Sequence, residues 1–426
     1  METKHHKLSN GMDLILVPQA GATSMTLLVL TKVGSRYETA KLNGASHFIE
    51  HLMFKGTEKR PNTQAISQEL DRYGAEFNAY TGKDMTGYYI KMDAAHTNTA
   101  VDMLHDMLFH SKFDPVELDR ERGVILEEIK MYEDNPRDHI SDLMESSLYH
   151  GSTLGWNIAG TRQTVSQMKR EDMIAYRDSY YVPGRITIAL AGKVDAKALE
   201  MFKKTFGKVA TPKKSLDKIF AKFHQPGRMT RPTALENKKI EQIQFSLGFY
   251  GLPYSHADRS AAGLLALILG GTMSSRLFIE IRERRGLCYA IRASHDCLED
   301  TGAFTVSAGL DRSRFKEAVK AIHGELNKIS SKPVEAEELD RAKEHLQGRM
   351  MLAFEDSAVR AEWYGRQWLF ERKLETPDQR LAKIRRVTAK DVLRVAKRLL
   401  DPKCMVTAAI GPLPTGSAMK KIIEWK

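Results

Sequence analysis

Short runs of apolar residues predict β-strands early in the chain. Residues 14–18, 25–30 and 86–92 read LILVP, MTLLVL and TGYYIKM, which combine β-branched or aromatic residues with strand-like alternation. The run NAYTGKDMTGYYI places GKD between two such stretches, so it predicts a β-hairpin. MTLLVL and GLLALILGG, at residues 263–271, have the length of core elements and fall short of the roughly 18 residues that a membrane span needs.

Long amphipathic helices are expected between these strands. Pro115 stands where the first residue of a helix would, and a helical pattern runs from it to about Glu133. Pairs of strands with intervening long helices, without regular βαβ alternation, indicate the α+β class.

The second half of the chain repeats the first. The segment that begins PVELDRERG at Pro115 resembles the one that begins PVEAEELDR at Pro333. The segments from Thr164 and Arg386 also resemble each other, which gives a repeat of about 215–220 residues. We expect two homologous domains, residues 1–210 and 236–426, joined by a polar, lysine- and proline-rich linker over residues 211–235.

Composition adds limits on class and location. The chain of 426 residues is too long for one ordinary core, and 42% hydrophobic with 28% charged residues is typical of globular proteins. The formal net charge is +11, but lysine and arginine alternate with acids along helices, so no nucleic-acid partner is expected. The three cysteines form no C-x-x-C pair, and the first residues resemble no signal peptide. We therefore expect a cytoplasmic protein without a membrane partner.

The stretch GASHFIEHLMFKGT, residues 44–57, places three polar residues in an apolar setting. On a helix His47 and His51 share a face, and Glu50 lies roughly 100° from His51. Two histidines at this spacing are more often ordinary members of an amphipathic helix than metal ligands. However, H-x-x-E-H is the inverted form of the zinc-protease signature H-E-x-x-H. A catalytic zinc site normally takes three protein ligands, so a third must come from elsewhere.

The internal repeat provides a control for this motif. Opposite the two histidines and the glutamate, the second half has Ala262, Ala266 and Leu265. Because the second half fills these positions with apolar residues, the fold does not need the polar trio. The motif therefore indicates a function.

A pair of glutamates on the helix after Pro115 follows the same logic. Glu121 and Glu128 are seven positions apart and share a helix face, whereas Glu127 points elsewhere. Single glutamates on helices are usually only solvated. In the second half Ala342 and Arg349 stand opposite this pair, so the acids are absent where the histidines are absent.

With these motifs the chain resembles the pitrilysin and mitochondrial-processing-peptidase family of zinc metallopeptidases, the inverzincins, in its short two-domain bacterial-type form. The spacings of 70 positions from His51 to Glu121 and 7 from Glu121 to Glu128 are those of the family. The likeness covers almost the whole chain. It includes GGTMSSRLFIEIRERRGLCYAI, residues 270–291, which is similar to the family's substrate motif of an arginine and a tyrosine, here Arg282 and Tyr289. Taken alone, these two would be a solvated arginine at a helix end and a core tyrosine.

The resemblance implies a fold and a catalytic site. The fold is α+β with two homologous α/β-sandwich domains, and the first domain holds one Zn²⁺ per chain. The implied ligands are His47, His51 and Glu128, with Glu50 as general base. Glu121 would orient a ligand histidine, as carboxylates around metal sites commonly do. Zinc acidifies water and polarises a peptide carbonyl, and a nearby carboxylate can take the proton.

The resemblance also implies how substrate binds. Arg282 and Tyr289 would stabilise the oxyanion or hold the peptide backbone. The strand at residues 77–81, FNAYT, is similar to the edge strand on which the family's substrates pair, which indicates Asn78 and Ala79. Backbone pairing of this kind is loose about side-chain sequence.

The function expected from the resemblance is a zinc endopeptidase acting on peptides or unfolded segments. Because the chain carries both the zinc motif and the Arg–Tyr pair, a homodimer that encloses a chamber is favoured, with Arg282 and Tyr289 serving the partner's zinc site. One alternative is the catalytic subunit of a heteromeric processing peptidase. A non-catalytic structural subunit is disfavoured because every motif residue is present, and a nucleic-acid-binding protein is disfavoured by the spread of charge.

Overall fold

The computed structural model describes residues 2–211, 220–230 and 232–425. The chain forms two compact units, each built around one β-sheet. The first unit comprises Met1–Ile129, Trp156–Phe220 and Met351–Glu375, and the second comprises Lys130–Gly155, Ala221–Met350 and Thr376–Lys426. The linker expected over residues 211–235 lies partly outside the described residues, and the domain boundaries inferred from the repeat stay a prediction.

The sheet of the first unit has six strands in the order β1-β2-β6-β3-β5-β4. Neighbouring strands are antiparallel except β2 and β6, which are parallel. The strands predicted from LILVP, MTLLVL and TGYYIKM are confirmed, and so is the hairpin, which joins β4 to β5. The bounds of the strands are β1 Lys4–Lys7, β2 Asp13–Pro18, β3 Ser24–Thr31, β4 Glu76–Thr81, β5 Thr86–Asp93 and β6 Ile186–Gly192.

Strand β3 is buried along almost its whole length because both of its faces are covered. Leu27 lies in the main core of the unit, whereas Leu28 and Leu30 lie on the opposite face, against helix α12 (Ser357–Glu371). The approach of α12 depends on Gly365, where a Cβ atom would lie 3.0 Å from Leu30 Cδ1. A strand buried on both faces is rich in apolar side chains such as these leucines.

Helix α1 of the first unit carries the predicted motif. The helix expected from Pro115 is confirmed as α4, whose last residues belong to the second unit. Helix α4 spans Pro115–Asp134. Besides α4 and α12, the described residues of this unit form helices α1 Ala45–Leu52, α2 Thr63–Asp71, α3 Thr97–His110, α6 Arg162–Gln167, α7 Arg170–Tyr180 and α8 Ala198–Lys204.

The second unit has a five-stranded sheet in the order β7-β11-β8-β10-β9. All neighbours are antiparallel except β7 and β11. Its strands are β7 Thr233–Asn237, β8 Gln242–Tyr250, β9 Cys288–Cys297, β10 Gly302–Asp311 and β11 Val406–Gly411. Its helices are α5 Pro136–Leu148, α9 Arg259–Ala266, α10 Phe315–Ser331, α11 Ala336–Ala353, α13 Pro377–Arg386, α14 Ala389–Leu399 and α15 Gly416–Ile423, with π-helical turns at Leu267–Gly271 and Phe278–Glu283.

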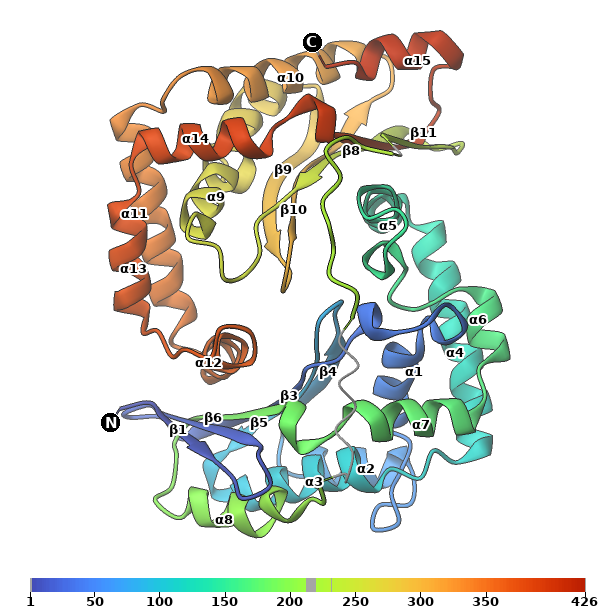
Figure 1. Cartoon of the computed structure of the whole chain (residues 1–426), viewed down its shortest axis with the longest axis vertical. Helices are drawn as coiled ribbons and strands as arrows, with labels where there is room; N and C mark the ends of the chain where they lie inside the picture. The colour runs from blue at the N-terminus through green and yellow to red at the C-terminus, as the bar shows by residue number, and fades with distance from the viewer. Residues whose placement is uncertain (1, 212–219, 231, 426) are drawn as a thin grey trace. The chain divides into compact units, whose positions relative to one another are not determined.

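Each sheet is covered on one face by a helix from the other half of the sequence. Helix α5 follows α4 in the chain but packs on β8 and β11, as α12 follows α11 but packs on β3 and β6 (Figure 1). Gly248 of β8 allows the close approach of α5, because a Cβ atom there would lie 2.5 Å from Met144 Sδ. Two mixed sheets packed with helices confirm the α+β class. No helix in the described part of the chain is long and apolar enough to cross a membrane.

Candidate metal centre

A buried carboxylate caps the N-terminus of helix α1. Glu38 accepts hydrogen bonds from the backbone N–H groups of Gly44 and Ser46, both at 2.8 Å, which satisfies donors that a helix start leaves free. Burial raises the pKa of Glu38 to about 7, although these hydrogen bonds oppose the shift. Gly44 has φ +98°, and a Cβ atom there would lie 2.7 Å from the carbonyl oxygen of Ala159. The start of the helix is therefore fixed by a glycine and a capping acid.

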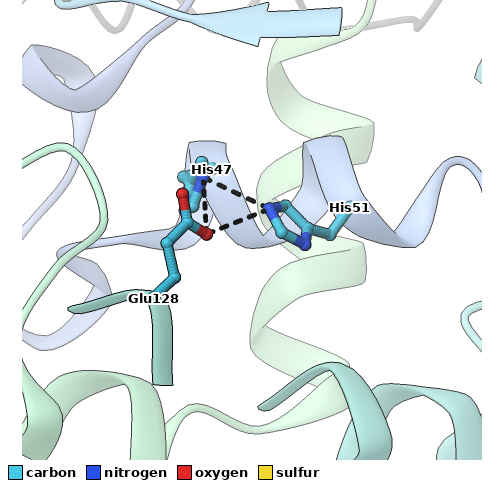
Figure 2. A group of neighbouring side chains, drawn as sticks. All are labelled: His47, His51 and Glu128. Carbon is cyan, nitrogen blue, oxygen red and sulfur yellow. Dashed lines mark hydrogen bonds and ion pairs between the residues drawn. The ribbon is translucent and has the colours of Figure 1, made fainter. Parts of the chain in front are cut away.

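Helices α1 and α4 bring His47, His51 and Glu128 together (Figure 2). The two histidine Nε2 atoms are 3.3 Å apart, and Glu128 Oε2 lies 3.7 Å from the first and 3.6 Å from the second. Within the residues that the structure describes, this is the one group of at least three His, Cys, Asp or Glu side chains placed to share a metal ion.

The three atoms fit a zinc ion. Ligand atoms about 2.0–2.2 Å from a tetrahedral zinc are roughly 3.3–3.6 Å from one another, close to the separations seen between these side chains. Burial, together with the neighbouring His51, lowers the pKa of His47 to about 4, so this imidazole is neutral and able to bind a metal. Two histidines and one glutamate also form a common ligand set for catalytic zinc. Glu127 is exposed and lies outside the group.

His51 is held by a chain of polar contacts through Glu121 to Lys55. Its Nδ1 atom is 2.9 Å from Glu121 Oε2, and Lys55 Nζ lies 2.6 Å from the other oxygen of that carboxylate. Burial opposes ionisation of Glu121, but hydrogen bonds from His51 and Lys55 hold its pKa below the ordinary value. A carboxylate in this position is the kind of partner that fixes the orientation of an imidazole and increases its basicity. Sequence reasoning missed Lys55, whose only signal is its position four residues after His51.

Glu50 points to the edge of the sheet. Thr81, the last residue of β4, donates a hydrogen bond of 2.5 Å from its hydroxyl to Glu50 Oε2. Burial raises the pKa of Glu50, although this hydrogen bond opposes the shift. A carboxyl with a raised pKa is a stronger base than an exposed one. Thr81 was also missed, although it ends the FNAYT strand that the sequence singles out.

Asn78 and Ala79 lie on β4, at one end of the sheet order. The Ala79 N–H donates to the side-chain oxygen of Asn78 at 2.9 Å. An edge strand offers backbone groups that another extended chain can pair with.

Arg282 and Tyr289 meet in the second unit. The Arg282 guanidinium lies 5.2 Å from the centre of the Tyr289 ring and 4.6 Å from that of Phe278. Arg282 comes from the second π-helical turn and Tyr289 from β9. The Tyr289 side chain is 68% exposed, so it is no core residue.

Comparison with known proteins places the chain in a family. The family model described as insulinase (peptidase family M16) matches residues 14–162. The family model described as the peptidase M16 inactive domain matches residues 167–346. The chain belongs to peptidase family M16. It is 34% identical to an uncharacterized zinc protease of Bacillus subtilis over 93% of this chain and 95% of the relative. It is also 34% identical to an uncharacterized zinc protease of Rickettsia felis, over 95% and 97% of the two chains.

Solved structures agree with this family assignment in their fold. The crystal structure of a protease from Helicobacter pylori matches with a TM-score of 0.88 and 24% identity, over 96% of this chain and 99% of that chain. The inverzincin resemblance and the fold of two homologous domains are thus confirmed. The relatives from Bacillus subtilis and Rickettsia felis are both named zinc proteases.

The second unit has buried apolar residues at the positions that correspond, in the internal repeat, to His47, Glu50 and His51. Ala262, Leu265 and Ala266 are all buried in the main hydrophobic cluster of the second unit. These side chains offer no metal-binding atom. Their apolar surroundings explain why the motif is dispensable for the fold, as the repeat indicates.

We expect Glu121→Gln to weaken zinc affinity about 10–100-fold, as changes around metal ligands commonly do. Lys55→Met should weaken it in the same direction but less, because the carboxylate loses its charged partner and keeps its contact with His51. Competition with a chromophoric chelator measures both affinities. Lys41→Met, which removes an exposed lysine paired with Asp172, is the control and should bind zinc like the parent protein. Unchanged zinc affinity in Lys55→Met would show that the ion pair between Lys55 and Glu121 does not contribute to zinc binding.

Proposed function

We propose that this M16 chain is a zinc-dependent endopeptidase that hydrolyses peptides or unfolded polypeptide segments, with one zinc ion per chain. The observation that carries the proposal is the triangle of His47, His51 and Glu128 atoms, 3.3, 3.6 and 3.7 Å apart, with Glu50 on the same helix. The names of the relatives as zinc proteases support it.

The catalytic groups divide the chemistry between them. A bound zinc ion would supply a Lewis acid that acidifies water and polarises a peptide carbonyl. Glu50 takes the proton from the attacking water and later delivers it to the leaving amine. Thr81 holds the Glu50 carboxylate at the end of β4, so the base stands beside the strand where substrate lies.

Peptide substrate is proposed to extend the first sheet along β4. There the Ala79 N–H, which now donates to Asn78, would donate to a carbonyl of the peptide. Such pairing requires an extended, unfolded segment and makes few demands on side chains. It accounts for a substrate class of peptides and unfolded polypeptides.

A homodimer is the assembly we propose, with a chamber in which Arg282 and Tyr289 of the partner subunit serve each zinc site. The chain carries both the zinc motif and the Arg–Tyr pair. The catalytic subunit of a heteromeric enzyme would need the Arg–Tyr pair from another chain. The alternative of a structural subunit remains disfavoured, because the five metal-site residues and the Arg–Tyr pair are all present.

Digestion of a peptide library tests the enzymatic activity. We expect cleavage, read by mass spectrometry, that a chelator abolishes and added zinc restores. The library also reveals the residues preferred on either side of the cleaved bond. Cleavage that survives exhaustive chelation would show that the proposed metal-dependent function is wrong.

Mixing two inactive variants tests catalysis in trans. Glu50→Gln lacks the base, and Arg282→Ala with Tyr289→Phe lacks the substrate groups. Random exchange of subunits makes about half of the dimers mixed, each with one intact site, so roughly a quarter of the parent activity should return. Subunit exchange is followed by native mass spectrometry. An exchanged mixture that stays inactive would indicate that each chain completes its own site.

A further inference from the structure

A pocket in the second unit gathers positive charge beside the Arg–Tyr pair. It has a volume of about 400 Å³ and is bounded by the first turn of α5, the second π-helical turn and strands β8, β9 and β10. Three arginines line it, Arg137 from α5, Arg282 from the π-helical turn and Arg292 from β9. No aspartate or glutamate stands among the described residues that line it.

Two of these arginines form no ion pair with an acid in the described part of the chain. Arg282 Nε lies 3.7 Å from the carboxylate of Glu283, whereas no carboxylate of the described residues forms an ion pair with Arg137 or Arg292. Both of these side chains are exposed at the pocket. A concave site lined by one sign of charge attracts ligands of the opposite sign.

The floor of the pocket is made of small residues and amides. Gly309 of β10 pairs with Gln244 of β8 on one side and with Ala290 of β9 on the other. A Cβ atom at Gly309 would lie 3.0 Å from Gln242 Oε1 and 3.4 Å from Gln244 Nε2, so a larger residue there would crowd the Gln242 amide. The glycine keeps room for two groups that can donate hydrogen bonds.

These donors match a carboxylate. Guanidinium groups bind carboxylates through paired, charge-assisted hydrogen bonds, and amide NH₂ groups can donate to the same oxygens. If Arg282 and Tyr289 hold the substrate backbone, Arg137 and Arg292 remain for a side chain of that substrate. The net charge of +11 would draw acidic peptides to the protein over a longer range.

We propose that this pocket binds the carboxylate of an aspartate or glutamate side chain, so that the enzyme prefers peptides with an acid near the cleaved bond. The inference rests on the proposed peptidase function. It deepens that function by naming a substrate class and two specificity-determining residues, Arg137 and Arg292.

Matched peptides test the preference. Peptides acetylated and amidated at their ends carry Glu, Gln or Lys at one position, moved in turn through the three residues on either side of the cleaved bond. At one of these positions we expect kcat/KM for Glu to exceed that for Gln about tenfold, mainly through KM, in line with a charge-assisted hydrogen bond. The ratio should fall as salt rises.

Variants of the pocket identify the residues responsible. Arg137→Ala and Arg292→Ala should each reduce the Glu-to-Gln ratio, and the double variant should bring it near one. Arg312→Ala removes an exposed arginine of the same unit that does not line the pocket, and should leave the ratio unchanged. An equal loss in Arg312→Ala would mean that net charge alone selects acidic peptides, which would overturn the assignment.

Binding separates this inference from the proposed function. Fluorescence polarisation of the same peptides on the Glu50→Gln variant measures the Glu-to-Gln ratio without turnover. A tenfold ratio in binding without cleavage by the parent protein would support the pocket and reject the peptidase. Chelator-sensitive cleavage of both peptides with equal kcat/KM would leave the peptidase and overturn the pocket. A preference that appears only for peptides with a free C-terminal carboxylate would assign the pocket to the peptide terminus and overturn the side-chain proposal.

Discussion

Glu50→Gln should abolish nearly all peptide cleavage while leaving the metal site intact. The amide is almost isosteric with the carboxylate and keeps a hydrogen bond to Thr81, but it cannot accept a proton from water. Removal of a general base typically costs about 10²–10⁴-fold in rate. Turnover of a quenched fluorescent peptide measures the loss, and atomic absorption should still find about one zinc per chain.

Glu127→Gln is the matched control for this loss. It makes the same chemical change at an exposed glutamate outside the metal group, and it should cleave at the parent rate. If Glu50→Gln kept the parent rate with zinc bound, another group would have to be the base and the mechanism proposed here would fail.

The pairing of the two histidines was predictable because their spacing is local, whereas the choice of Glu128 as the third member of the group came from the family resemblance. Two histidines four apart share a helix face whatever surrounds the helix, and two glutamates seven apart do the same. The repeat then distinguished function from fold, since Ala262 and Ala266 show that the second half is built without histidines at these positions. What spacing could not show is how closely the two helices approach, because this depends on packing across 70 positions of sequence.

The contacts that Lys55 and Thr81 make with the motif residues could not be predicted from the sequence, for the same reason. Lys55 reaches Glu121 and Thr81 reaches Glu50 only after the helices and β4 are packed together. A lysine after a helix and a threonine at a strand end are ordinary residues in ordinary places. Their roles are visible only through the distances between them and the motif.

The apolar pattern predicted strands but not what covers them. MTLLVL indicated a buried strand, but one of its two faces is covered by α12, a helix more than 300 positions later in the chain. Similarly, the repeat divides the chain into two continuous halves, whereas α5 and α12 each pack on the sheet of the other half. Gly248 and Gly365 are positions where these helices closely approach the strands, but a glycine in a sequence does not indicate which element will pack against it.

The second large effect is expected at the third ligand. Glu128→Ala should lose zinc, because two imidazoles alone hold it far more weakly than two imidazoles with a carboxylate. The loss should exceed the roughly 10–100-fold expected for Glu121→Gln, which leaves all three ligands in place. Glu127→Ala, one position away on the exposed side of α4, should bind zinc like the parent protein.

Thermal unfolding provides an independent measure of the same difference. A ligand that binds only the folded protein stabilises it by about 2.7 kcal/mol at 100 times its Kd, so added zinc should raise the Tm of the parent and of Glu127→Ala. Glu128→Ala should show no such rise at the same zinc concentration, while its Tm without zinc stays near that of the parent, since Glu128 is only partly buried. Loss of the zinc response in Glu127→Ala with a normal response in Glu128→Ala would move the third ligand by one position. The assignment of the metal site to the helix face shared by Glu121 and Glu128 would then be wrong.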